Sequence, residues 1–151
     1  MMLNMVQALN QAMLQEMERD DRVLLLGEDV AVDGGVFRVS EGLLEKLGPQ
    51  RVIDTPLAES TIVGASIGLA VAGLRPIAEI QFMGFMYQAF NQIVSHAARL
   101  RNRSRGRYTV PLVIRTPYGA GVKALEHHSE STEAFFCHIP GIKVVVPSTP
   151  Y

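Results

Sequence analysis

The sequence predicts an α/β fold in which a parallel β-sheet is covered by helices on both faces. Continuous apolar runs such as Val23–Leu26 are typical of strands that are buried on both sides. These runs alternate with segments of helical period, and that alternation favours parallel strands joined by helical crossovers. With 151 residues, 48% hydrophobic and 19% charged, the chain can form one domain with a core of its own.

The first half of the chain contains three predicted helices and two predicted strands. Asn4–Asp20 has apolar residues at helical spacing, and Asn4 with Gln7 resembles a capping box. The strand at Val23–Leu26 ends in Gly27-Glu28-Asp29 and is followed by a glycine-bearing loop. The next expected elements are a helix at Ser40–Leu47 closed by Gly48-Pro49, a strand at Val52–Ile53, and a helix at Ser60–Ala72 with Gly73 at its C′ position.

The second half continues the alternation. Pro76–Phe82 and Leu112–Ile114 are predicted strands, and Phe85–Arg99 between them is a predicted helix. A short helix is expected from about Thr132 to His138, with Ser131 as its N-cap. A last strand is expected at Ile142–Val146. The closing segment, Pro147 to Tyr151, is expected to be a connection that leads onward, so we expect a fragment whose second domain is absent.

Composition excludes several classes of function. The net charge of −1 gives no basic footprint for nucleic acid or for an anionic membrane. No run approaches the roughly 20 apolar residues that a membrane-spanning helix requires. The single cysteine, Cys137, excludes an internal disulfide framework and favours a reducing, cytoplasmic location.

Small residues recur every four positions along the helix that follows Glu59. Ser60, Gly64, Gly68 and Ala72 therefore lie on one ridge. Each glycine costs up to about 1 kcal/mol in a helix interior relative to alanine, so close approach of another element is expected. The ridge can pack within the chain, or it can form a subunit interface that positions Glu59 against another chain.

Three side chains are candidates for chemistry, and each has a plain structural alternative. Glu59, just before a helix, suits the helix dipole as well as a catalytic role. Phe85, at a helix start, can simply be a core residue, and His128 can be a satisfied loop histidine. The acidic residues and histidines within 126–138 could also suggest a metal site, but their spacing matches none of the usual zinc-binding signatures.

Read together, the segments resemble the β subunit of the thiamine-diphosphate-dependent 2-oxo-acid dehydrogenases. That family includes the pyruvate, branched-chain 2-oxo-acid and acetoin dehydrogenases. The resemblance runs from about Val6 to Tyr151 and covers the first half of such a subunit, its pyrimidine-binding domain. It rests on Leu26-Gly-Glu-Asp29, Gly34-Gly-Val-Phe37, Asp54-Thr-Pro-Leu-Ala-Glu59, Glu79-Ile-Gln-Phe82, His128-Ser129 and Pro140-Gly-Ile-Lys-Val-Val145, and on the spacing of Glu59, Gly64 and Gly68.

The resemblance implies a role for individual residues. Glu59 matches the glutamate that hydrogen-bonds the pyrimidine ring of the cofactor and favours its imino tautomer. Phe85 matches an aromatic residue, often tyrosine, that packs on that ring. His128 matches a histidine at the mouth of the active site that is proposed to assist acyl transfer. Further matches are Gln81 and Leu57 in the same pocket, Glu28 in a supporting role, and backbone carbonyls near Leu112 at a structural potassium site.

The sequence lacks one motif that thiamine enzymes carry. Thiamine enzymes hold Mg²⁺ and the diphosphate through a Gly-Asp-Gly motif, and this chain has none. The resemblance therefore implies half a cofactor site, completed by an α subunit in an α2β2 assembly, with oxidative decarboxylation of a 2-oxo acid and acyl transfer to the lipoyllysine of an acyltransferase core. The alternatives are an acetoin dehydrogenase, a piece of a transketolase-like enzyme, and a noncatalytic binding module. Phe82-Met-Gly-Phe85 favours pyruvate, whereas Glu133-Ala-Phe-Phe136 favours a branched-chain acid.

Overall fold

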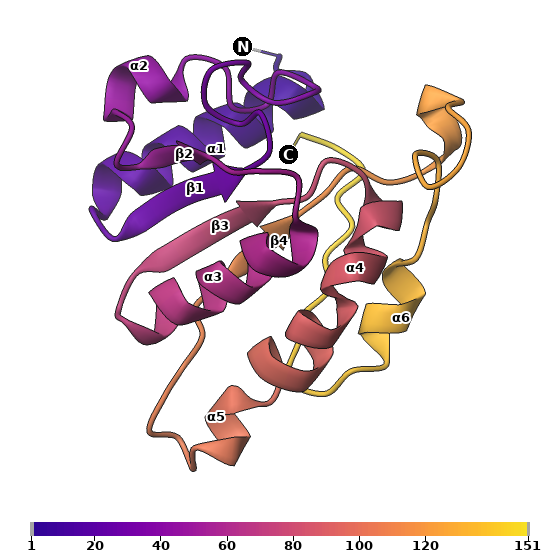
Figure 1. Cartoon of the computed structure of the whole chain (residues 1–151). Helices are drawn as coiled ribbons and strands as arrows, with labels where there is room; N and C mark the ends of the chain where they lie inside the picture. Colours follow the sequence, from indigo (N-terminus) through magenta and orange to yellow (C-terminus); the bar gives the residue numbers. More distant parts are fainter. Residues whose placement is uncertain (1, 151) are drawn as a thin grey trace.

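The computed structural model describes residues 2–150, so Met1 and Tyr151, the ends of the expected domain, lie outside it. Figure 1 shows helices and strands alternating along most of this range. The elements are α1 (Met5–Arg19), β1 (Val23–Gly27), α2 (Leu43–Leu47), β2 (Val52–Asp54), α3 (Glu59–Val71), β3 (Arg75–Glu79), α4 (Met86–Asn91), α5 (Leu100–Arg103), β4 (Val113–Arg115) and α6 (Glu133–Cys137). A 3-10 turn over Met83–Phe85 leads into α4, and a π-helical segment over Gln92–Ala97 continues it.

The strands form one parallel sheet in the order β2-β1-β3-β4. Because they are parallel, their carboxyl ends meet at one edge. The register aligns these ends: Gly27 lies opposite both Asp54 and Glu79, and Glu79 lies opposite Arg115. The sheet thus brings the last residues of four separate sequence segments into one row.

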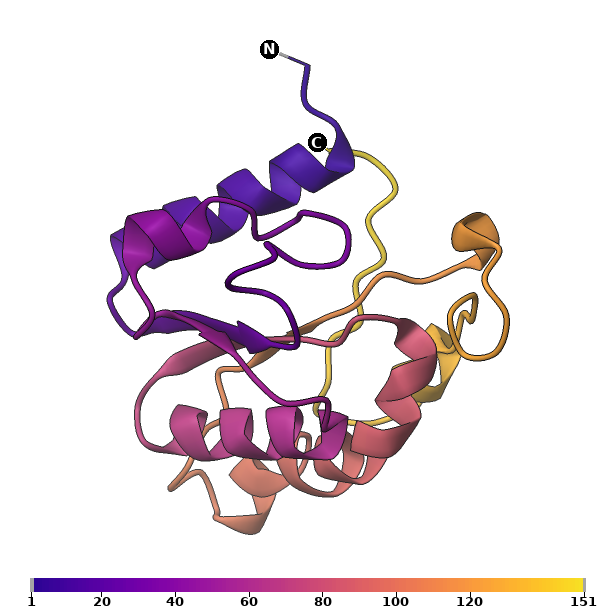
Figure 2. The same ribbon diagram turned by 45° about the horizontal axis from the view of Figure 1, so that its top comes forward.

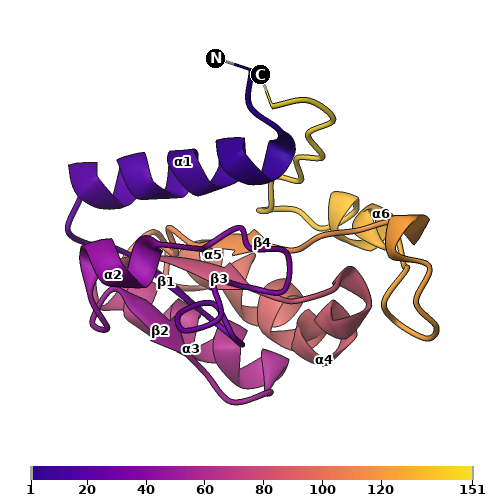
Figure 3. The ribbon, with the colours of Figure 1, turned by 90° about the horizontal axis from the view of Figure 1, so that it is seen from above.

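Helices cover both faces of the sheet, as predicted. Figure 2 and Figure 3 show α1 and α2 over one face, and α3 and α4 over the other. Alternate side chains of a strand serve the two layers, so Ile77 joins the core beneath α1 whereas Ala78 joins the core beneath α3. All five residues of β1 are buried, which explains its continuous apolar run.

The ends of two helices confirm the local rules. The backbone N–H of Gln7 donates to the Asn4 side chain at 2.9 Å, and that of Asn4 donates to Gln7 Oε1 at 3.1 Å, which completes the predicted capping box. Gly73 follows α3 with a φ of +102°, the left-handed conformation expected at C′.

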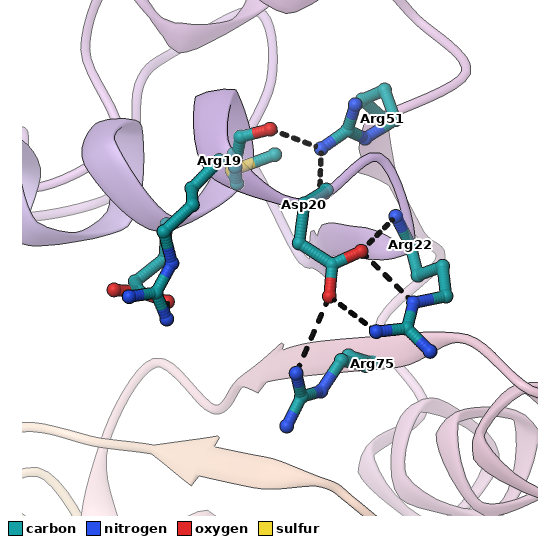
Figure 4. Close-up of polar contacts among 7 residues, drawn as sticks. Arg19, Asp20, Arg22, Arg51 and Arg75 are labelled. Carbon is teal, nitrogen blue, oxygen red and sulfur yellow. Dashed lines mark hydrogen bonds and ion pairs between the residues drawn. The ribbon is translucent and has the colours of Figure 1, made fainter.

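Arg51 fastens the end of α1 to the start of the sheet (Figure 4). Its Nη2 donates to the carbonyl oxygens of Met17 and Asp20, at 2.7 and 3.1 Å, and its Nε donates to Val23 O at 2.6 Å. Met17 O lies in the last turn of α1, where carbonyls lack intrahelical partners, so the guanidinium satisfies it and ties α1 to β1.

The Asp20 carboxylate gathers two further arginines (Figure 4). It accepts hydrogen bonds from the side chain and the backbone N–H of Arg22, at 2.8 to 2.9 Å, and pairs with Arg75 Nη1 at 3.3 Å. The Arg22 side chain is the largest cause that holds the pKa of Asp20 well below its usual range, followed by the Arg22 backbone. The ionised form of Asp20 therefore stabilises the fold.

Several sequence predictions are wrong in detail. The strand expected at Pro76–Phe82 ends at Glu79, and the helix expected at Phe85–Arg99 is α-helical only over Met86–Asn91. The helix expected at Ser40–Leu47 begins only at Leu43, because Gly42 has a φ of +77° and the Asn10 amide ties the preceding loop by donating to Val39 O. The cap of α6 is Thr132 rather than Ser131, without a side-chain hydrogen bond. Among the described residues, 142–146 form no strand. Their alternate side chains Ile142 and Val144 pack on the core, but a cleft of about 900 Å³ is lined by both this segment and β4.

Candidate active site

The candidate residues cluster at the carboxyl edge of the sheet. Glu28 follows β1, the segment after β2 leads to Glu59, and Gln81 follows β3. In open parallel sheets, ligands bind outside the carboxyl ends of the strands. The fold therefore gathers these sequence-distant residues in the place where such folds bind ligands.

Glu59 is the first residue of α3, one position earlier than the predicted helix start. Its side chain is buried, with 4% of its surface exposed. Within the described part of the chain, Glu59 Oε2 has no hydrogen-bond partner. A buried carboxylate oxygen without a partner is costly, so this atom is available to a donor from outside the chain.

The charge of the Glu59 carboxylate also affects the pKa of Glu28. That pKa is raised above the ordinary value, mainly by burial and then by the negative charges of Asp29 and Glu59. The two glutamates are therefore close enough to interact electrostatically, and Glu28 holds a proton more readily than a solvated glutamate.

Two aspartates that sequence reasoning missed shape the loop after β1. Asp54 accepts hydrogen bonds from the backbone N–H of Ala31 at 2.7 Å and of Val32 at 3.2 Å. Asp29, at a φ of +58°, accepts a hydrogen bond from Gln81 Nε2 at 3.0 Å. The available signal was an aspartate at the end of a strand, where its carboxylate can reach neighbouring backbone amides.

A largely buried ion pair joins the carboxyl ends of β3 and β4. The Arg115 guanidinium pairs with the Glu79 carboxylate, and these side chains are 16% and 6% exposed. Next to Glu79, the end of β1 approaches β3 so closely that a Cβ at position 27 would lie 2.7 Å from Glu79 O, which favours glycine there. Sequence reasoning missed the pair because its members lie 36 residues apart on different strands.

Phe85 and His128 meet in one aromatic cluster with Phe82. The imidazole centre lies 4.6 Å from the ring centre of Phe82 and 5.0 Å from that of Phe85, both edge-on. His128 Nδ1 lies 3.0 Å from Leu125 O and 2.6 Å from Glu126 O. Since carbonyl oxygens can only accept, Nδ1 carries the hydrogen and Nε2 is the basic nitrogen of the neutral ring.

The loop that carries His128 rests directly on the turn before α4. A Cβ built on Gly84 would collide with His127 O and would lie 2.7 Å from His127 Cα. The absence of a side chain at Gly84 therefore allows the two backbones to approach. Gly84 is a further residue of the site that sequence reasoning missed.

A second contact ties the same loop to α4. His127 Nδ1 lies 3.2 Å from Glu130 Oε1. A hydrogen bond to the Glu130 side chain, burial, and the negative charge of Glu130 together raise the pKa of Tyr87 on α4. Glu130 therefore joins the loop and the helix through its carboxylate.

Two expected site residues lie apart from this cluster. Leu57 is in the loop before Glu59, but 67% of its surface is exposed. Leu112 directly precedes β4, at the amino end of the sheet and so at the opposite edge from Glu59. No three His, Cys, Asp or Glu side chains in the described part of the chain are grouped so that they could hold a metal ion. No helix within residues 2–150 is long and apolar enough to cross a bilayer.

The small-residue ridge of α3 is only partly covered. A Cβ on Gly64 would contact the Gln92 side chain at 3.6 Å, whereas a Cβ on Gly68 would meet nothing within 4 Å. Packing within the chain therefore accounts for the first glycine but not for the second.

Comparison with known proteins agrees with this geometry. The family model described as "Transketolase, pyrimidine binding domain" matches residues 1–151. The chain is 56% identical over 149 residues to the "Pyruvate dehydrogenase E1 component subunit beta" of Acholeplasma laidlawii, covering 99% of this chain and 46% of that protein. It is 54% identical over 149 residues to the "2-oxoisovalerate dehydrogenase subunit beta" of Bacillus subtilis, again covering 99% and 46%.

A third relative is the "3-methyl-2-oxobutanoate dehydrogenase subunit beta" of Mycobacterium tuberculosis, 56% identical over 148 residues, or 98% of this chain and 42% of that protein. The chain thus spans less than half the length of these curated relatives. A solved structure titled "Split gene transketolase, inactive beta4 tetramer" has the same fold, with a TM-score of 0.65 at 19% identity over 88% of this chain and 39% of that one. The chain belongs to the family of transketolase-type pyrimidine-binding domains.

Proposed function

We propose that this chain is the pyrimidine-binding part of the β subunit of a thiamine-diphosphate-dependent 2-oxo-acid dehydrogenase. The observation that carries the proposal is Glu59 Oε2, a buried carboxylate oxygen without a partner among the described residues. A ring nitrogen of the cofactor's pyrimidine, once protonated, would be a suitable donor for it. The relatives named for pyruvate and for branched-chain 2-oxo acids support this class of reaction.

Each element of the site has a distinct task in this proposal. Bound thiamine diphosphate supplies the electron sink for decarboxylation of the 2-oxo acid. Glu59 holds and orients the pyrimidine ring through a charge-assisted hydrogen bond in a dry environment, where such a bond is strong. Glu28 keeps its own carboxyl group protonated more readily, which limits the negative charge beside Glu59. Phe85 offers an apolar surface for a flat ring.

His128 is the residue that we propose to accept and donate protons. Its Nδ1–H is held by two backbone carbonyls, so the ring presents Nε2 as base or acid beside Phe82 and Phe85. An imidazole nitrogen that can accept and donate a proton suits acyl transfer to a lipoyl group, the step that we propose for the acyltransferase core.

The rest of the site is proposed to come from elsewhere. We propose that an α subunit supplies the Mg²⁺ and diphosphate ligands in an α2β2 assembly, and that the uncovered part of the α3 ridge at Gly68 takes part in the subunit contacts. Gln81 and Leu57 are proposed to line the pyrimidine pocket, and backbone carbonyls near Leu112 to contribute to a potassium site. The single cysteine, Cys137, supports a cytoplasmic location.

The test uses the intact β subunit assembled with its α partner. Turnover is followed with an artificial electron acceptor, using pyruvate, 2-oxoisovalerate and acetoin in parallel. Glu59→Gln should lower kcat by about 100-fold or more, since it removes the charge that polarises the pyrimidine. Glu18→Gln, on the exposed face of α1, is the matched control. Full activity of Glu59→Gln would falsify the role of Glu59. Tight binding of cofactor with Mg²⁺ to the 151-residue chain alone, if Glu59→Gln abolishes it, would contradict the two-subunit site.

A further inference from the structure

The segment that precedes β4 carries an unusual concentration of positive charge. Between Glu79 and Glu126 the sequence has no acidic residue, yet it has six arginines and one lysine. This segment therefore carries a charge of +7, and since the whole chain has a net charge of −1, the rest of the chain carries −8. Five of the arginines alternate with other residues in Arg99–Arg107, a stretch that we call the arginine segment.

The arginine segment lies far from the candidate active site. It includes α5 and precedes β4, so it is at the amino edge of the parallel sheet, whereas Glu59 is at the carboxyl edge. Figure 1 shows α5 projecting at the end of the molecule away from the loops that follow β1 and β2. A ligand at the cofactor site does not account for these charges.

Three of the five arginines have partners within the chain. Arg99 Nε donates to Val94 O at 3.1 Å, and Arg103 Nη2 donates to Ser95 O at 2.7 Å. The guanidinium of Arg107 lies 5.5 Å from the ring centre of Tyr108. Within residues 2–150, none of the five forms an ion pair with a carboxylate.

The other two arginines face a shared hollow of about 680 Å³. Its lining includes the polar residues Arg101, Asn102, Arg105 and Thr109, together with apolar alanine, valine and proline residues. No acidic residue lines it. In the described part of the chain, none of these four side chains forms a hydrogen bond.

We infer that this hollow binds the phosphate group of a small organic phosphate. The guanidinium fork matches a phosphate group bidentately, and hydroxyl and amide groups supply the neutral donors that such sites use. The neighbouring arginines raise the positive potential without occupying the hollow. Its volume accommodates an organic moiety beside the phosphate, against the apolar walls.

The test measures binding of inorganic pyrophosphate to the 151-residue chain by calorimetry, at fixed ionic strength and without Mg²⁺. The wild-type chain should bind one equivalent. The double variant Arg101→Gln/Arg105→Gln should bind at least about tenfold more weakly for each guanidinium removed. The matched control Arg19→Gln/Lys46→Gln changes the net charge equally on exposed positions of α1 and α2 and should bind as the wild type does.

Backbone NMR of the wild-type chain gives an independent readout that needs no variant. Pyrophosphate should shift the amide signals of Asn102, Gly106 and Thr109 together, while those of Glu28 and Glu59 stay in place. Equal weakening in both double variants would show attraction by diffuse charge and would overturn the inference. So would citrate binding as tightly as pyrophosphate, or shifts confined to the carboxyl edge of the sheet.

Discussion

Replacing Gly84 by alanine should displace the loop that carries His128. The added Cβ would lie 2.7 Å from His127 Cα and 2.8 Å from His127 C, whereas ordinary contact begins at 3.4 Å. The loop backbone must therefore retreat by at least about 0.7 Å, and by more where His127 O, the nearest atom, meets the new Cβ. Gly84 does not have a positive φ, so alanine fits its backbone conformation and the effect is steric alone.

The expected cost is that of an overpacked contact, about 1–3 kcal/mol in the free energy of unfolding. For a chain of this size it corresponds to a drop in Tm of about 2–4 °C for each kcal/mol. The His128 ring, now 4.6 Å from the ring centre of Phe82, should lose much of its ring-current shift in the NMR spectrum. Urea unfolding and histidine NMR of the 151-residue chain measure both effects.

Gly68→Ala is the matched control, because its Cβ would meet no atom within 4 Å. The same change should there stabilise the chain by up to about 1 kcal/mol, since alanine is the better helix former. If Gly84→Ala is as stable as the wild type and leaves the His128 signals unchanged, the close approach is not what positions the loop.

Three further predictions concern titration. Carboxyl NMR should show Glu28 titrating above its ordinary pKa, and Glu59→Gln should lower that pKa because it removes a negative charge; an unchanged Glu28 would contradict their proximity. Asp20→Asn should destabilise the chain at neutral pH, because the contacts that depress the pKa of Asp20 stabilise only its ionised form. The loss in stability should shrink as pH falls below the unfolded-state pKa of aspartate. A pH-independent difference in urea unfolding would refute this. Glu130→Gln should lower the raised pKa of Tyr87, seen as earlier tyrosinate absorption in an alkaline titration, and an unaltered titration would refute the contact.

The sequence predicted best what depends on local pattern. The capping box at Asn4, the glycine at the end of α3, and the buried strand Val23–Leu26 follow from rules that involve a few neighbouring residues. The expected strand at 142–146 failed because an apolar run states that a segment is buried, not that its backbone has a partner. Here Ile142 and Val144 pack on the core, while both the segment and β4 line a cleft instead of pairing with each other.

The candidate site divides in the same way. Glu59, Phe85 and His128 were found from their segments, and the structure puts Phe85 and His128 in contact. Gly84 could not be found, because its role is the space that it leaves for His127, 43 residues further along the chain. The pair of Glu79 and Arg115 was hidden for a related reason, since strand register rather than sequence spacing sets it.

The concentration of positive charge in the arginine segment has a practical consequence. A net charge of −1 suggests a protein that a cation-exchange column would not retain near neutral pH. Adsorption depends on the face that meets the resin, and the arginine segment presents several cations within a few residues of one another. The chain should therefore be held by a cation exchanger at low salt, through this one segment, despite its net negative charge.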